Sequence, residues 1–498
     1  MKLWFTSDNV DWDAGRYHYA AEQMMLTLFP AERPEYPETP APTSLATEDN
    51  AVIFTLHRGK KLTNMSALLL RGGRWNNGVV RFPSEKLDET PEQVYHTVQR
   101  SVKQSFYKAG TMLLGGDLPW GSLTGVRPVK LPTKALLEGA TPAQAEKELG
   151  ETYHVSPLRR KLAMDCAAQS VKAIHSLAPD EVSLYVGVPF CPSRCLYCSF
   201  ISAAVDQCLP LVEPFVDALC REIAAAGDLL RRRAKVVRTL YMGGGTPTTL
   251  SPEQLDAVLT ALETHIGLSR CTELTVEAGR PDTITPEKLA VLAAHGVGRV
   301  SVNPQSMADE VLRRMGRPHT GADIRRAYAQ VRAAGAFAVN MDLIAGLPGD
   351  SPDGFARSLA EVLDMAPENI TVHTLALKKG SRLMEHPEEL PSDGDVEAML
   401  GCAWSALRQA GYSPYDLYRQ KYMSGSFENV GWAKPGTESL YNIIMMEELH
   451  SVLALGGGAV TKVIEGGGKL TRYANPKYPK EYLERIDAIL REKQTLPL

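Results

Sequence analysis

Short β-rich runs alternate with helical stretches from Ser183 onwards, and this alternation constrains the fold more than any other feature. Six runs occur: "SLYVGV", "VVRTLYM", "ELTVEA", "RVSVNP", "FAVNMDLI" and "NITVHTLAL". Strands that alternate with helices form parallel sheets with right-handed crossovers. Eight such units close a full barrel. Six therefore predict an α/β fold with a partial (β/α)6 barrel, three-quarters closed and open on one side.

Helix signals between the runs support this interpretation. In "SPEQLDAVLTAL", Ser251 is the predicted N-cap, Pro252 takes the first helical position and Gln254 completes a capping box. "TPEKLAVLAAHG" repeats the arrangement, with Gly296 as its predicted C-cap. The helices should therefore begin and end close to these residues.

The pattern predicts three domains. Residues 1–178 form an N-terminal α/β domain that includes the linker "PAERPEYPETPAPTS", whose five prolines exclude a helix or a central strand. Residues 179–391 hold the partial barrel. The pattern loosens over residues 392–498, which we expect to form a mainly α C-terminal domain that caps the substrate.

Composition excludes several classes of protein. A net charge of −4 over 498 residues gives no overall attraction to nucleic acid or anionic membranes. The chain lacks an apolar run long enough to span a membrane, and its first residues lack the apolar stretch of a signal peptide. Its eight cysteines are clustered, which does not suggest a secreted disulfide scaffold. We expect a cytoplasmic protein without nucleic-acid or membrane-spanning functions.

Three cysteines follow the first predicted strand, in "VPFCPSRCLYCSF". Cys191, Cys195 and Cys198 have the spacing C-x3-C-x2-C, which leaves three interpretations open. A structural zinc site needs a fourth ligand, for which Cys208 is nearest. A catalytic cysteine needs only one of the three. A four-iron cluster held by three thiolates leaves one iron open to a ligand that is not protein.

Chemically useful residues also follow the other strands. In a parallel barrel the loops after the strands gather at one face, where active sites are built. The glycines of "GGGTPT" let the backbone approach a ligand closely, and carboxylates can accept hydrogen bonds from hydroxyl or ammonium groups. The residues expected to converge there are Tyr185, Gly243 to Thr248, Glu277, Gln305, Asp342 and Ala376.

The cysteine spacing resembles that of the radical S-adenosylmethionine (radical SAM) superfamily. The motifs "LYVGVPFCPSRCLYCSF", "YMGGGTPTTL", "VNPQSM" and "MDLIAGLPGDSPDGF" together resemble the oxygen-independent coproporphyrinogen III oxidase group. "PYDLYRQKYMSGSFENVGWAKPG" and "LALGGGAVTK", with "LTGVRPVKLP" in the N-terminal region, resemble its HemZ-type branch, so the likeness spans nearly the whole chain.

The resemblance implies a [4Fe-4S] cluster on Cys191, Cys195 and Cys198, with S-adenosyl-L-methionine (SAM) as cosubstrate. It implies catalytic roles for Tyr185 and these three cysteines. The SAM contacts carried over by motif are Tyr185, Tyr197, Gly244, Gly245, Thr246, Glu277, Gln305, Arg317 and Asp342, with Ala376 carried over by its distance from Asp342.

The implied reaction is oxidative decarboxylation of coproporphyrinogen III propionates to vinyl groups, giving protoporphyrinogen IX in anaerobic haem biosynthesis. An electron donor such as flavodoxin or ferredoxin is the implied partner. Propionates need cationic partners, for which we identify Arg419, Lys421 and Lys434.

Two alternatives stay open: a haem-binding chaperone of the same superfamily, and another tetrapyrrole-modifying radical SAM enzyme. The best-characterised oxidases continue the cysteine motif with x-C, where this chain has Ser199-Phe200. A haem carrier would need a ligating side chain, for which His319 and His373 are available.

Overall fold

A computed structural model describes residues 1–10, 12–42, 46–198, 203–335, 337–377, 381–385, 389–420 and 424–498. The chain forms two units. The first comprises Met1–Pro128 and Glu138–Met164, and the second comprises Val129–Leu137 and Asp165–Leu498. Helix α5 (Pro157–Ser176) contributes to both. The predicted boundaries at residues 178 and 391 do not coincide with this division and stay predictions.

The first unit is a four-stranded sheet with helices. Its elements are β1 (Lys2–Ser7), α1 (His18–Leu28), β2 (Ala51–Arg58), β3 (Leu62–Arg71), β4 (Arg74–Pro83), α2 (Pro91–Leu114) and α4 (Pro142–Glu151). The strands are ordered β1-β2-β3-β4, with β1 parallel to β2 and the other pairs antiparallel. Apolar side chains such as Met24, Phe54 and Phe106 form its core. The expected N-terminal α/β fold is present.

The second unit contains the predicted parallel sheet. Its parallel strands are β5 (Glu181–Val188), β8 (Val236–Gly244), β9 (Glu273–Glu277), β10 (Arg299–Ser301), β11 (Ala338–Ala345) and β12 (Asn369–Thr374), each hydrogen-bonded to the next. Each contains or overlaps one of the six runs identified in the sequence. Because all six are parallel, their carboxyl ends lie together, on the side that we call the carboxyl edge. Their amino ends lie on the opposite side, the amino edge.

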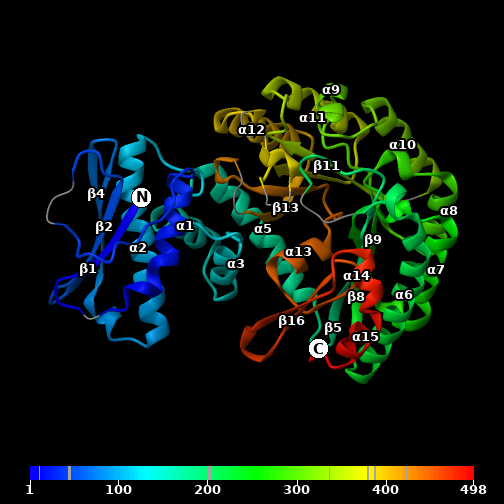
Figure 1. The fold of residues 1–498 in the computed structure, drawn as a ribbon, viewed down its shortest axis with the longest axis horizontal. Helices are drawn as coiled ribbons and strands as arrows, with labels where there is room; N and C mark the ends of the chain where they lie inside the picture. Colours follow the sequence, from blue (N-terminus) through cyan, green and yellow to red (C-terminus); the bar gives the residue numbers. More distant parts are fainter. Residues whose placement is uncertain are drawn as a thin grey trace. The chain divides into compact units, whose positions relative to one another are not determined.

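Helices connect these strands, as the alternation predicts. They are α6 (Val205–Arg232), α7 (Pro252–Ile266), α8 (Pro286–Ala294), α9 (Asp309–Arg314), α10 (Gly321–Ala334) and α11 (Pro352–Met365). Figure 1 shows α6, α7, α8 and α10 in succession along the outer side of the sheet. The capping box of Ser251 and Gln254 forms as predicted. Helix α8 has His295 as its C-cap, and Gly296 follows it with φ +67°.

Residues 392–498 are not mainly α, so that part of the prediction is wrong. They contain α12 (Asp393–Gln409), α13 (Leu440–Glu447), α14 (Pro479–Glu484) and α15 (Ile486–Gln494), but also β13 (Ser413–Tyr418), β14 (Asn429–Ala433), β15 (Val452–Gly456), β16 (Val460–Ile464) and β17 (Leu470–Ala474). In the described residues the sheet has the order β13-β14-β12-β11-β10-β9-β8-β5-β15-β16-β17. Strands β13 and β14 lie beyond β12, and β15, β16 and β17 lie beyond β5, so the added strands widen the sheet on both sides.

Local sequence signals for these added strands are weak. Strand β14 is buried at all five positions, so it shows no alternation of polar and apolar residues. The register of β13 shifts between Pro414 and Asp416. A bulge of this kind breaks the period-two pattern.

None of the described helices is both long and apolar enough to cross a membrane.

Candidate active site

The three cysteines lie in the loop after β5, at the carboxyl edge of the sheet. Cys191 ends the short strand β6 (Phe190–Cys191), and Cys195 and Cys198 follow. Cys195 is buried, with 8% of its surface exposed, and the other two are half-buried. The loop therefore holds its central thiol away from solvent.

Contacts from other segments fix the loop. The N–H of Leu196 donates to the carbonyl of Met315 (3.0 Å), and its carbonyl accepts from Ser381 Oγ (2.9 Å). Tyr197 packs against the apolar cluster of Val311, Met315, Ile344, Leu347, Leu375 and Leu383. Leu196 and Tyr197 directly follow Cys195, so these contacts with other segments set the position of Cys195.

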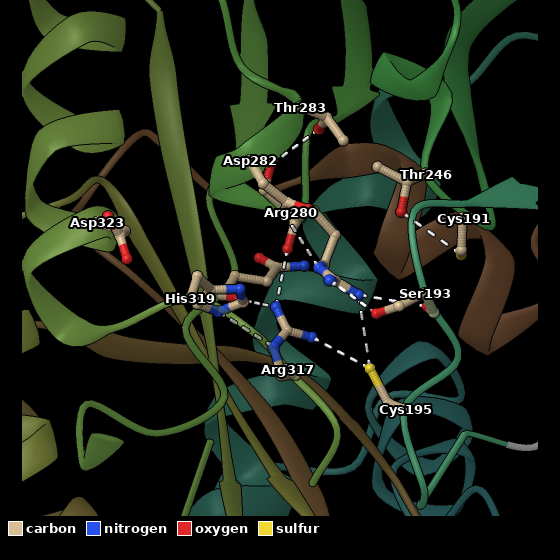
Figure 2. Close-up of polar contacts among 12 residues, drawn as sticks. Cys191, Ser193, Cys195, Thr246, Arg280, Asp282, Thr283, Arg317, His319 and Asp323 are labelled. Carbon is tan, nitrogen blue, oxygen red and sulfur yellow. Dashed lines mark hydrogen bonds and ion pairs between the residues drawn. The ribbon is translucent and has the colours of Figure 1, made fainter. Parts of the chain in front are cut away.

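Two buried arginines converge on Cys195 (Figure 2). Arg317 Nη1 lies 3.7 Å from Cys195 Sγ and 3.1 Å from Tyr197 Oη. Arg280 Nη1 lies 3.9 Å from the same sulfur, and its Nη2 donates to Ser193 Oγ (3.0 Å). Their exposed fractions are 4% and 3%. Two buried guanidinium cations therefore stand beside one buried thiol.

Neutral groups complete the surroundings of Arg317. Its Nη2 donates to the carbonyls of Gly279 (3.1 Å) and Asn303 (2.7 Å), and its Nε donates to His319 Nε2 (3.3 Å). Burial, with the charges of Arg317 and Arg280, lowers the pKa of His319 to about 4. His319 is therefore neutral and already accepts a hydrogen bond, which leaves it poorly suited as a haem ligand.

The glycine motif lies against the start of the cysteine loop. The N–H of Gly245 donates to the carbonyl of Val188 (2.8 Å), and that of Thr246 donates to the carbonyl of Phe190 (2.7 Å). Thr246 Oγ1 lies 3.5 Å from Cys191 Sγ. A Cβ at Gly245 would stand 2.3 Å from the carbonyl oxygen of Phe190. Only glycine allows the two loops to approach this closely.

Glu277, at the end of β9, lies in a stack of tyrosines. Tyr241 Oη donates to Glu277 Oε1 (2.6 Å), and the Tyr241 ring stacks between Tyr185 (centroids 6.4 Å apart) and Tyr441 (4.7 Å). Burial, together with the negative charge of Asp342, raises the pKa of Glu277 to about 7 despite the hydrogen bond from Tyr241. Glu277 can therefore change its charge near neutral pH.

Asp342 lies on β11, two residues beyond Asn340, the residue that is in register with Ser301 and Glu277. Its Oδ1 accepts from Asn340 Nδ2 (2.7 Å), and its Oδ2 lies 3.6 Å from His373 Nε2. Burial alone would raise the pKa of Asp342, but hydrogen bonds from His373, Asn340 and Thr371 outweigh it, so the pKa is lowered. Asp342 thus keeps its negative charge near Glu277. His373 interacts with the Asp342 carboxylate.

Gln305 has an unusual backbone at this edge. Its φ is +68°, a left-handed conformation that costs a non-glycine residue free energy. The strain is held by two main-chain hydrogen bonds, from Gln305 N to the Asp342 carbonyl (2.8 Å) and from Ile344 N to the Gln305 carbonyl (2.9 Å). Ala376 lies just beyond β12 and is half-buried.

The cations predicted to bind propionates are separated. Arg419 follows β13 at the carboxyl end of β12, is buried and donates from Nε and Nη2 to the Ser426 carbonyl (3.1 and 2.9 Å). Burial lowers its pKa to about 10, so it stays charged at neutral pH. Lys434 follows β14, which runs antiparallel to β12 and so ends at the amino edge. Lys434 therefore lies at the opposite end of the strands from the cysteine loop, and its substrate contact stays a prediction. Lys421 lies outside the described residues.

Sequence reasoning missed two features of this site. Arg280 lay in "GRPD" without a chemical signal of its own. Tyr241 and Tyr441 were not singled out, although alternation along β8 places Tyr241 on the same face as Gly243. Their proximity to Tyr185 depends on sheet order and on the position of α13, neither of which is local in sequence.

The residues present fit an iron–sulfur cluster with a bound cosubstrate. The donor set is three thiols in one short loop with two guanidinium groups beside one of them, which suits a negatively charged thiolate-bound group. The glycine motif packs directly against the start of the cysteine loop, where a Cβ at Gly245 would collide with Phe190. Among the described residues, these cysteines included, no three His, Cys, Asp or Glu side chains are grouped closely enough to hold a single metal ion.

Comparison with known proteins agrees with this geometry. Residues 185–362 match the model of the Radical SAM superfamily. The chain is 38% identical over 412 residues to the "Oxygen-independent coproporphyrinogen-III oxidase-like protein HemZ" of Bacillus subtilis, covering 82% of each chain. It is 28% identical to the "Heme chaperone HemW" of Haemophilus influenzae, covering 61% of this chain and 76% of HemW.

A solved structure shares the fold. Coproporphyrinogen III oxidase (HemN) from Escherichia coli superposes with a TM-score of 0.52 at 24% identity, over 65% of this chain and 72% of HemN. At this identity the likeness supports the arrangement of strands and helices only. Members of the superfamily use a [4Fe-4S] cluster and SAM. The cysteine loop, the matched superfamily region and the extended similarity to HemZ together establish that this chain belongs to the radical SAM superfamily, within the HemZ-like branch of the oxygen-independent coproporphyrinogen III oxidase group.

Proposed function

We propose that the protein is a cytoplasmic radical SAM oxidoreductase that decarboxylates two propionate side chains of coproporphyrinogen III to vinyl groups, giving protoporphyrinogen IX. The observation that carries this proposal is the convergence of Cys195, its two arginines, the glycine motif and two carboxylates on one edge of the sheet. Similarity to HemZ over most of the chain supports the choice of substrate.

Cys191, Cys195 and Cys198 would hold the [4Fe-4S] cluster, with SAM as the ligand of the remaining iron. When bound, cluster and SAM supply hydrogen-atom abstraction, the step that the propionate β-carbon requires. Each propionate then loses carbon dioxide and passes one electron to an external one-electron acceptor to become a vinyl group. An external one-electron donor such as flavodoxin or ferredoxin would supply the reducing electron.

The chain's own residues bind and orient SAM and the substrate, and they exclude water. Gly244 and Gly245 offer main-chain groups at close approach, because neither has a Cβ in the way. Glu277 and Asp342 present carboxylate oxygens to the hydroxyl and ammonium groups of SAM. Tyr185 lies beside the glycine motif, since its Oη would be 3.5 Å from a Cβ at Gly244. These groups hold the reacting centre against the substrate.

Arg419 is the residue we assign to a substrate propionate. It is a buried cation at the carboxyl edge, and its guanidinium geometry suits a carboxylate. Arg419→Met should raise the KM for coproporphyrinogen III without changing SAM binding. An unchanged KM would remove Arg419 from the substrate site.

The test of the function is an anaerobic assay with reconstituted protein, SAM, a low-potential reductant and coproporphyrinogen III. We expect vinyl products by chromatography and 5'-deoxyadenosine formation that rises with substrate. The haem-carrier alternative rests on the similarity to HemW. It predicts haem association with neither vinyl product nor substrate-dependent SAM cleavage, and that result would overturn the proposal.

A further inference from the structure

The two arginines on Cys195 differ in their other contacts. Arg317 bonds to neutral groups, as described above. Arg280 also reaches the carbonyl of Ser193 (3.3 Å) and pairs with Asp282 (Nε to Oδ1, 3.3 Å), whose side chain is 35% exposed. Two buried cations and one partly exposed anion thus surround a single sulfur. Positive charge is in excess at this point.

A buried cation without a matched anion is costly. Arg317 and Arg280 are among the most buried charged residues of the chain, and their shared neighbour is Cys195 Sγ. A thiolate bound to an iron–sulfur cluster would supply the missing negative charge. Charge and hydrogen bonds around cluster sulfurs are also what set a cluster's reduction potential.

We propose that Arg280 acts with Arg317, through the thiolate of Cys195, to raise the reduction potential of the cluster. This proposal depends on the proposed cluster and deepens its role. On reduction the cluster gains one electron from an external one-electron carrier and takes up no proton, so its charge becomes more negative by one. A guanidinium beside Cys195 stabilises that more negative state. Asp282 opposes the effect.

A purely structural role for Arg280 makes a different prediction. Its bonds to Ser193 anchor the cysteine loop. If anchoring were its whole role, Ser193→Ala would disturb the cluster in part, because it removes the contact to Oγ and keeps the one to the main-chain carbonyl. Arg280→Lys would then behave like Arg280→Gln, because lysine cannot reproduce the forked contact. The charge proposal instead groups Arg280→Lys with the wild type.

The experiment measures the cluster's midpoint potential in reconstituted full-length protein without SAM or substrate, by titration with reduced viologen and electron paramagnetic resonance. For Arg280→Gln we expect the ratio of reduced to oxidised cluster, at the wild-type midpoint, to fall about tenfold, which is about 59 mV for a one-electron couple. Arg280→Lys and Ser193→Ala should stay within about threefold of the wild type. Asp282→Asn should raise the ratio.

Several outcomes overturn the proposal. Equal midpoints in wild type, Arg280→Gln and Asp282→Asn would do so, as would a drop in Ser193→Ala equal to that in Arg280→Gln. If Arg280→Gln fails to keep iron, Asp282→Asn still decides the matter by the direction of its shift. Wild-type protein that forms no cluster would refute the proposed function itself, which separates the two failures.

Discussion

The carboxyl edge and the amino edge of the parallel sheet differ in the partners that their polar side chains contact. At the carboxyl edge, Arg280 and Arg317 both lie beside Cys195 Sγ, Arg280 also pairs with Asp282, and Glu277 accepts from Tyr241. At the amino edge, Glu273 accepts from Ser439 Oγ and from the N–H of Leu440, both at 2.7 Å. It thereby caps the N-terminus of α13, where a negative charge is favourable.

Other amino-edge groups are matched in the same way. Arg299 donates to Asn369 Oδ1 and to the carbonyl of Thr437 (2.9 Å), and Lys434 Nζ donates to the carbonyl of Ala366 (2.6 Å). These side chains satisfy main-chain acceptors and side-chain amides. The difference teaches that polar side chains at the amino edge tie neighbouring segments together, whereas at the carboxyl edge two arginines meet at a single thiol. Parallel barrels divide stability and function between their edges in this way.

Cysteine substitutions at the two edges should show the largest contrast. Cys195→Ser is expected to abolish the cluster's visible absorption and SAM cleavage, because serine is a poor ligand for this soft iron site. Cys271→Ser is the matched control, since Cys271 lies half-buried beside the amino end of β9 and contacts the Glu273 carbonyl. Iron analysis and absorption spectra check both variants. Cluster loss in Cys271→Ser would contradict the division of the sheet.

Removing the α13 cap tests the amino edge in the opposite sense. Glu273→Ala deletes the two short charge-assisted hydrogen bonds from Ser439 and Leu440 and the longer ones from Tyr441 and Thr275, so we expect it to destabilise the protein by about 2 kcal/mol. Glu273→Gln keeps one oxygen acceptor and should lose less. Thermal unfolding measures the loss, while iron content per folded molecule should stay at the wild-type level. A variant that kept its melting temperature but lost iron would place Glu273 with the site instead.

The sequence predicted the parallel core of this sheet because its signals are local. Capping residues such as Ser251 and the β-rich runs each act within a few positions, and the structure follows them. The convergence of Glu277 and Asp342 was also predictable, because parallel strands end at one edge. Lys434 could not be placed in that way. Its edge depends on the antiparallel direction of β14, which no local pattern specifies.

Arg280 shows the same limit inside the site. Nothing in "GRPD" distinguishes this arginine from an exposed one, yet it is 3% exposed and lies beside Cys195. Its burial results from the meeting of the cysteine loop with the segment after β9, 85 residues apart in the chain. Residues that act through such long-range contacts become visible only in three dimensions.

The pH dependence of SAM binding examines the carboxyl edge more finely. The pKa of Glu277 is raised to about 7, so the carboxylate is mostly protonated at pH 6 and mostly ionised at pH 8. If the ionised form accepts hydrogen bonds from SAM, affinity should fall about tenfold from pH 8 to pH 6. Equilibrium binding to reconstituted protein measures this. Glu277→Gln should bind more weakly at pH 8 and show a flat profile over this range.

The same raised pKa predicts how Glu277 affects stability. Between its ordinary value and about 7 the folded state binds the extra proton, so this group's contribution to the free energy of unfolding falls as the pH rises through that window. Glu277→Gln should remove that slope. A sloping SAM-binding profile that persisted in Glu277→Gln would assign the titration to another group.

Lys434→Met should have the smallest effect, although the chain's motifs suggested a substrate contact. Its ammonium bonds to the Ala366 carbonyl at the end of α11 and lies 5.6 Å from the centre of the Tyr412 ring. Losing these exposed contacts should cost roughly 0.5 kcal/mol in thermal unfolding. The KM for coproporphyrinogen III should stay within about twofold of wild type, while Arg419→Met raises it. If both variants raised KM equally, substrate binding would extend to the amino edge, and the separation of the two edges would no longer hold.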